Sequence, residues 1–170
     1  MSEKFINTLP FVIAGLAVWA LVFFRAKKQE KSYDERQLLA RNSAFKTAFF
    51  TLAGYCVVCA FLNMLGINWA LTATQMFLGV ILSIGVFACI CLYRDAFFDF
   101  AKKNQKLYIF EMMAFSVIQV IGGVGMLHGQ PIWGEEGLSF VSIVFATALC
   151  FFAVGVTAAI KTYTDARQED

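Results

Sequence analysis

Two cysteines at the spacing of a redox or metal motif are the first candidates for chemistry in this chain. Cys56 and Cys59 form a CxxC pattern, which serves thiol exchange or metal binding where the two sulfurs can meet. They lie within an apolar run, where a regular helix holds their Cβ atoms about 5–6 Å apart, whereas a disulfide needs roughly 3.5–4.5 Å. The other thiols, Cys89, Cys91 and Cys150, are scattered, and the chain has one histidine. We therefore expect packing roles for the cysteines, with no bound metal and no cofactor.

One acidic residue lies inside a segment that is apolar enough to cross a membrane. Glu111 occurs in the run 107–127, and Gln119 follows about two helical turns later. Ionisable groups at membrane depth are costly and often functional. Both side chains are expected to face the interior of a helical bundle. An interhelical hydrogen-bonding pair and a proton or ion path both stay open, although the predicted spans hold no second acid or base to pass charge on.

The densest group of polar side chains precedes the second apolar run. Ser32 and Glu35 fit a capping box, and neither Pro nor Gly interrupts residues 32–53. Residues 34–46 are therefore expected to form a cytoplasmic helical stem that continues into a membrane span. The charges of this stem exceed what topology requires, so it is either a solvated helix extension or a surface that binds a cytosolic partner. The candidate partner-binding residues are Asp34, Glu35, Arg36, Gln37 and Arg41.

Composition shows that most of this chain is suited to lipid. Of 170 residues, 59% are hydrophobic and 15% are charged, against about 45–50% and about 25% in soluble domains. A helix needs about 20 apolar residues to cross the hydrocarbon core. Five stretches have this length and leave no room for a second domain, so we expect one all-α membrane domain over residues 1–170. The spans are expected at about 5–24, 47–65, 73–93, 107–127 and 138–160.

The basic residues predict how these five transmembrane helices are threaded. Thirteen of the fourteen Lys and Arg lie in the segments 25–46, 94–106 and 161–167, and the exception is Lys4. Short basic loops stay in the cytoplasm, which places the C-terminus inside and the N-terminus outside. We expect a multi-pass protein of the plasma membrane, with the lipid bilayer as its first partner.

Two further patterns concern how the helices begin and pack. Thr72 followed by Gln75 is expected to form a capping box at the start of the third span. Small residues four apart allow two helix backbones to approach closely. They predict a compact bundle and leave self-association into a homo-oligomer open. The pairs are Gly79 with Ser83, Gly125 with Gly129, and Gly155 with Ala159.

The stem also carries a resemblance. The run Tyr33-Asp34-Glu35-Arg36-Gln37, followed by Ala40, Asn42 and Ala44, resembles small polytopic membrane proteins of Gram-positive bacteria with a DER-type motif before a membrane helix. The resemblance covers about residues 32–50. Some proteins of this kind are encoded beside DNA-binding regulators and hold them inactive at the membrane, and others accompany export or immunity systems. It implies regulation through binding.

No residue pattern typical of an enzyme is found. The sequence has no Gly-rich phosphate loop, no HExxH and no nucleophile placed with a base, and topology explains its basic residues without direct nucleic-acid binding. We expect a non-enzymatic regulator or adaptor that binds a cytosolic or membrane protein, for example a transcription regulator, through the stem 34–46 and the loop 94–106. The alternative is a small transporter, or a membrane subunit of a transport or immunity system, that uses Glu111 and Gln119.

Overall fold

The computed structural model describes residues 34–97, 105–129, 131–134 and 137–168. This part of the chain forms four helices and a hairpin of two-residue strands. Each helix is long and apolar enough to cross a membrane, so the prediction of an all-helical membrane bundle is confirmed in these residues. The expected span 5–24 lies outside the described residues. The elements are α2 (Glu35–Met64), α3 (Thr72–Tyr93), α4 (Gln105–Met126), β1 (Trp133–Gly134), β2 (Gly137–Leu138) and α5 (Val141–Gln168).

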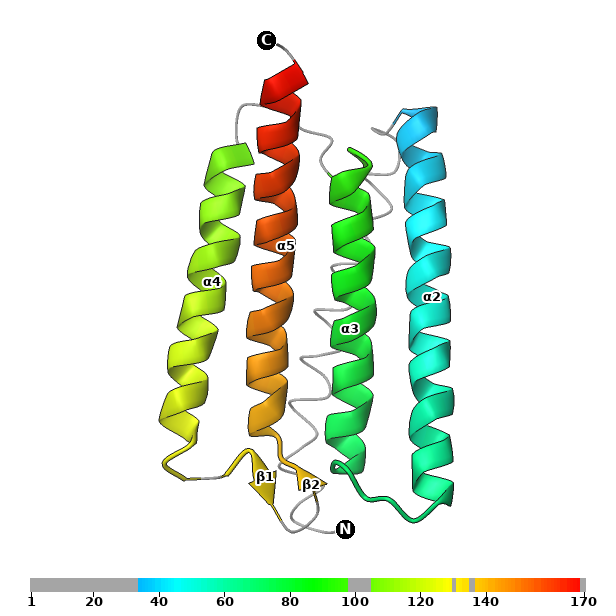
Figure 1. Cartoon of the computed structure of the whole chain (residues 1–170), viewed down its shortest axis with the longest axis vertical. Coiled ribbons are helices and arrows are strands. Elements are labelled where there is room, and N and C mark those ends of the chain that lie inside the picture. Colours follow the sequence, from blue (N-terminus) through cyan, green and yellow to red (C-terminus); the bar gives the residue numbers. More distant parts are fainter. Residues whose placement is uncertain (1–33, 98–104, 130, 135–136, 169–170) are drawn as a thin grey trace, which may run out of the picture.

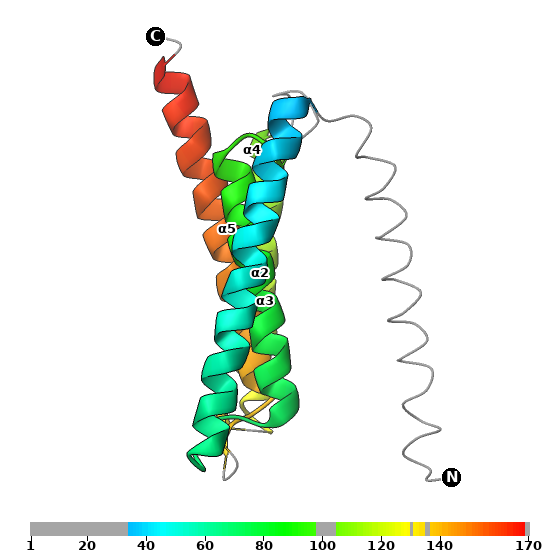
Figure 2. The ribbon, with the colours of Figure 1, turned by 90° about the vertical axis from the view of Figure 1, so that its right-hand side faces the viewer.

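The four helices stand side by side in one row (Figure 1). α5 packs between α4 and α3, and α2 packs on the other side of α3. Turned by 90°, the helices largely overlap, as expected of one layer seen from its edge (Figure 2). Each runs opposite to the helix before it in the chain, because short connectors favour antiparallel neighbours.

The described parts of the basic connectors lie at one end of the row. The start of α2, the end of α3, the start of α4 and the end of α5 all lie there, at the top of Figure 1. We call this the basic end, because Arg36, Arg94 and Lys161 come from the three basic segments of the sequence. The described parts of these segments thus lie on one side, as the sequence predicts. That this side faces the cytoplasm stays a prediction.

Many of the buried residues are small, and many large apolar residues point outward. Ala44 and Ala48 on α2 are 0% and 5% exposed, whereas Phe45, Phe49 and Phe50 on the same helix are exposed. The close approach lets the Ser83 hydroxyl of α3 donate to the main-chain carbonyl of Ala48 at 3.0 Å. This distribution is typical of helices surrounded by lipid, which associate through small residues rather than by burying large ones.

Both helix starts differ in detail from expectation. The stem is confirmed as part of one unbroken helix from Glu35 to Met64, but its capping box consists of Asp34 and Gln37. Asp34 Oδ1 accepts from the Glu35 amide at 2.7 Å, and Gln37 Oε1 accepts from the Asp34 amide at 3.4 Å. Ser32, the predicted N-cap, lies outside the described residues, and the described box consists of an Asp–Gln pair with the same chemistry at the same spacing.

The predicted cap of the third span is wrong. Leu71 occupies the N-cap position of α3 and makes no side-chain cap. Gln75 is buried instead, and its Nε2 donates to the carbonyl of Ala70 at 2.8 Å while its Oε1 accepts from Asn63 Nδ2 at 3.2 Å. The amide of Gln75 therefore ties the end of α2 to the start of α3 rather than capping a helix.

The end opposite the basic end is closed by main-chain pairing. β1 and β2 are antiparallel, with Trp133 opposite Leu138 and Gly134 opposite Gly137. Leu138 also pairs with the connector before α3, because its amide donates to the carbonyl of Trp69 at 2.9 Å. The hairpin therefore joins the start of α5 to the start of α3.

Candidate functional site: a groove at the basic end

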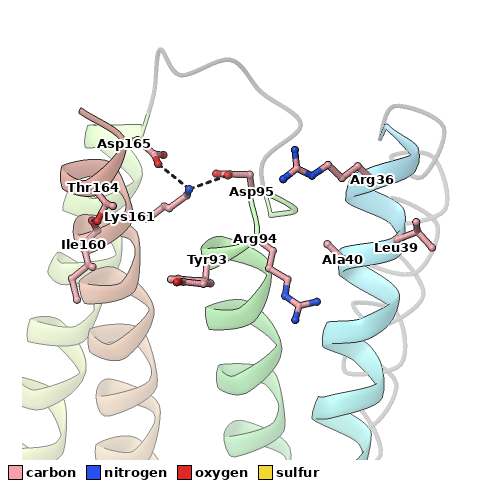
Figure 3. Close-up of a pocket in the computed structure, with 10 residues that line it drawn as sticks. All are labelled: Arg36, Leu39, Ala40, Tyr93, Arg94, Asp95, Ile160, Lys161, Thr164 and Asp165. Carbon is pink, nitrogen blue, oxygen red and sulfur yellow. Dashed lines mark hydrogen bonds and ion pairs between the residues drawn. The ribbon is translucent and has the colours of Figure 1, made fainter. Parts of the chain in front are cut away.

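A groove opens at the basic end because the helix in the middle is shorter than its two neighbours. α3 has 22 residues, whereas α2 has 30 and α5 has 28. Both neighbours project past the end of α3, and the end of α5 leans away from α2 (Figures 1 and 2). The cavity above α3 measures about 550 Å³ and is open on one side. It is lined by Arg36, Leu39, Ala40, Tyr93, Arg94, Asp95, Ile160, Lys161, Thr164 and Asp165 (Figure 3).

The floor of the groove is the C-terminal cap of α3. Asp95 has a φ of +55°, in the left-handed region that Asp and Asn tolerate better than most side chains. Its amide donates to the carbonyl of Leu92 at 3.2 Å, and the amide of Ala96 donates to that of Cys91 at 2.8 Å. These two bonds make a Schellman motif, which ends the helix and buries Ala96 completely. The turn directs the carboxylate of Asp95 toward α5 (Figure 3).

A lysine on α5 meets that carboxylate. Lys161 Nζ lies 3.0 Å from Asp95 Oδ2 and 2.8 Å from Asp165 Oδ1, one turn further along α5. The Lys161 side chain is 23% exposed, so its charge is partly withdrawn from water. One cation between two carboxylates therefore joins the end of α3 to the end of α5.

Two hydrogen bonds join the end of α3 to α2 on the other side. Gln37 Nε2 donates to the main-chain carbonyl of Asp95 at 3.0 Å. Arg94 Nη1 donates to the hydroxyl of Ser43 at 3.1 Å. With the Lys161 bridge, these bonds connect all three helices that form the groove.

The five predicted stem residues do not form one surface. Asp34 caps α2, Gln37 is half-buried and bonds to α3, and Arg41 is half-buried. Glu35 and Arg36 are exposed, and Arg36 lines the groove. Asp34 is exposed as well, so three of the five are presented to a ligand or partner, while Gln37 and Arg41 are half-buried.

Sequence reasoning did not single out the ion pairs of the groove. Lys161 and Asp165 are four residues apart, which is a recognisable helical pair. Asp95, the other partner of Lys161, lies in a different segment of the chain, and no local spacing connects the two. Only the packing of α3 on α5 brings them together.

The intramembrane pair Glu111 and Gln119 is not brought together at an interior site. Glu111 is exposed on α4 and Gln119 is half-buried, so the expected shared interior face is wrong for Glu111. The packed face of α4 includes Ser116, whose hydroxyl donates to the carbonyl of Ala148 on α5 at 3.0 Å, and Gly123, which lies against Phe145. Small residues decide which side of α4 approaches α5, and Glu111 lies off that side.

The thiols are dispersed in the described helices. All five cysteines are free, and Cys56 is exposed whereas Cys59 is buried. The CxxC pair therefore spans the boundary between the outer and the packed face of α2.

No protein-family model, curated protein or solved structure matches this chain. The groove lining combines three cationic side chains, two carboxylates and exposed apolar side chains. What it can bind follows from this chemistry: an anionic group that has an apolar portion beside it.

Proposed function

We propose that this protein is a non-enzymatic membrane regulator or adaptor that docks a cytosolic partner at its basic end. The observation that carries the proposal is the set of polar bonds connecting α2, α3 and α5 there. The bridge from Lys161 to Asp95, the bond from Gln37 to Asp95 and the bond from Arg94 to Ser43 all cross between helices. These bonds hold the turns of α2 and α5 that extend past the end of α3 in one fixed arrangement.

A fixed arrangement favours binding because less side-chain and loop freedom is lost when the partner docks. The first turns of α2 carry exposed charges of both signs, on Glu35 and Arg36, which suits recognition of a charged protein surface. The positive-inside rule supports the placement of this end in the cytoplasm of a bacterial plasma membrane. The resemblance of residues 32–50 to membrane proteins that hold regulators is in line with the same role.

A site-specific cross-linking experiment tests the docking proposal. A photoreactive residue at Asn42, which is exposed seven residues after Glu35 on the same face of α2, should give a discrete protein adduct in intact cells. Glu35→Lys should lower the yield of that adduct about tenfold, because a charged contact at an interface contributes about 1.5–3 kcal/mol. The adduct is quantified on immunoblots and identified by mass spectrometry.

The matched control places the same photoreactive residue at His128, which is exposed near the opposite end. It should give no such adduct. Equal adducts from both positions, or an Asn42 adduct that Glu35→Lys leaves unchanged, would refute docking at the basic end.

A further inference from the structure

We propose that the groove at the basic end binds the phosphate group of an anionic phospholipid from the adjoining membrane leaflet. This inference goes beyond the docking of a protein partner and does not depend on it. It rests on the charges of the groove, on its apolar side chains and on its position at the ends of three membrane-length helices.

The cationic side of the groove lies on α2. Lys161 is engaged by Asp95 and Asp165, so its charge is not available to a ligand, and the three groups together carry a formal charge of −1. Among the described residues, Arg36 makes no hydrogen bond or ion pair, and it extends from α2 toward the end of α3 (Figure 3). A guanidinium presents five donors in a planar fork that matches two oxygens of a phosphate. Arg36 is therefore the residue best placed to hold the anion.

Arg94 supplies a second guanidinium in the same groove. One of its nitrogens is bound to the hydroxyl of Ser43, and the side chain is otherwise exposed. The groove as a whole holds three cations and two carboxylates, a formal net charge of +1. Lys161 and its two carboxylates sum to −1, so the positive charge of the groove comes from Arg36 and Arg94.

The apolar side chains of the groove favour a lipid over a water-soluble anion. Leu39, Tyr93 and Ile160 are 66%, 71% and 58% exposed, although they line the groove. A free phosphate would leave them uncovered, whereas the glycerol and upper acyl chains of a lipid would cover them, at about 25 cal/mol per Å² of apolar surface. The volume of about 550 Å³ is in the usual range of small-ligand sites, roughly 300–1,000 Å³.

The depth of the groove fits the same ligand. α3 is a membrane-length helix, and the groove begins where it ends. The phosphates of a leaflet lie at the ends of such helices, and basic sites between transmembrane helices on the cytoplasmic side are typical places for anionic headgroups. The groove can therefore hold one lipid with its phosphate at Arg36 and its chains along α2 and α5.

Lipid retention by the full-length protein tests this assignment. Purified protein in neutral detergent is mixed with equal amounts of phosphatidylglycerol and phosphatidylcholine, and bound lipid is counted by native mass spectrometry. The wild type should retain one phosphatidylglycerol in preference to phosphatidylcholine. Arg36→Gln should lower that occupancy about tenfold, since a charge-assisted bond to phosphate is lost. Arg36→Lys should restore part of it.

Two variants separate the groove from general charge and from misfolding. Leu39→Trp changes no charge but fills the groove from an exposed position, so it should also reduce retention. Arg167→Gln removes an exposed cation of α5 outside the groove and should leave retention unchanged. Circular dichroism of each variant checks that the helices are intact. Glu35→Lys, which tests protein docking, should likewise retain phosphatidylglycerol.

Competition identifies the source of the anion. Inorganic phosphate and a glutamate-rich peptide, each at the concentration of the lipid, should not displace phosphatidylglycerol. Displacement by inorganic phosphate would assign the groove to a soluble phosphate, and displacement by the peptide would assign it to an acidic protein segment. Either result, or a wild type that binds both lipids equally, would overturn the proposal.

Discussion

Replacing Gly137 with alanine is expected to lower the free energy of unfolding by about 2–5 kcal/mol. Gly137 has a φ of +88°, where an L side chain is strained. A Cβ atom at this position would lie 2.5 Å from the carbonyl carbon and oxygen of Trp69. Those are main-chain atoms, so no side-chain rotation relieves the contact. The hairpin must move away from the connector before α3, which breaks the pairing of Leu138 with Trp69.

Gly66→Ala is the matched control, because it separates backbone strain from crowding. Gly66 has a similar φ of +74°, but nothing lies within 4 Å of its ideal Cβ position. It should therefore cost only about 1–2 kcal/mol for the left-handed conformation. Unfolding of both variants in mixed micelles is followed by circular dichroism, and quenching of Trp69 and Trp133 fluorescence reports on the hairpin. Equal losses for the two glycines would contradict close packing at Gly137.

The membrane-spanning segments could be predicted because both of their determinants are local. Apolar length marks each span, and cations mark the connectors on one side. Hence each of the expected spans 47–65, 73–93, 107–127 and 138–160 overlaps one helix of the structure, with the last beginning three residues before α5. The continuity of the stem with the second span could be predicted for a similar reason, since nothing between residues 34 and 64 interrupts a helix except Gly54, which is tolerated.

The rotation of each helix could not be predicted in the same way. In water the large apolar side chains mark the buried face, but in lipid every side is apolar, so that signal disappears. Small residues then determine the contacts, as Ser116 and Gly123 do on α4, and small residues are frequent by chance. The sequence for this reason predicts an interior position for Glu111, whereas the structure leaves it exposed.

The candidate site was foreseen only in part. Local spacing predicts a capping box at Ser32 and Glu35, and the structure has one at Asp34 and Gln37. The groove itself depends on three helices of unequal length meeting at one end. Its central contact joins Lys161 to an aspartate that a Schellman turn holds at a positive φ. No local pattern in the sequence shows that α2 and α5 extend past the end of α3, and none shows that Lys161 meets Asp95.

Lys161→Gln is the second change with a large expected effect, a loss of about 2 kcal/mol in the free energy of unfolding. The substitution leaves Asp95 and Asp165 without their cation and removes the ionic link between α3 and α5. Because Lys161 Nζ, from a side chain that is 23% exposed, bonds two carboxylates at once, the loss should exceed that of one surface ion pair, which is about 0.2–1 kcal/mol, although the Asp95 side chain is 64% exposed. Unfolding in mixed micelles measures it, and limited proteolysis near residue 95 reports whether the end of α3 loosens.

A double-mutant cycle assigns that loss to its two partners. Asp95→Asn removes the charge while keeping a side chain that tolerates the left-handed conformation, so it isolates the link between helices. Asp165→Asn removes only the contact within α5 and should cost less than about 0.5 kcal/mol. Lys161→Gln should be coupled to Asp95→Asn by about 1 kcal/mol and only weakly to Asp165→Asn. Additive losses at positions 95 and 161 would show that their contact does not hold the groove together, and the docking proposal would lose the rigid surface on which it rests.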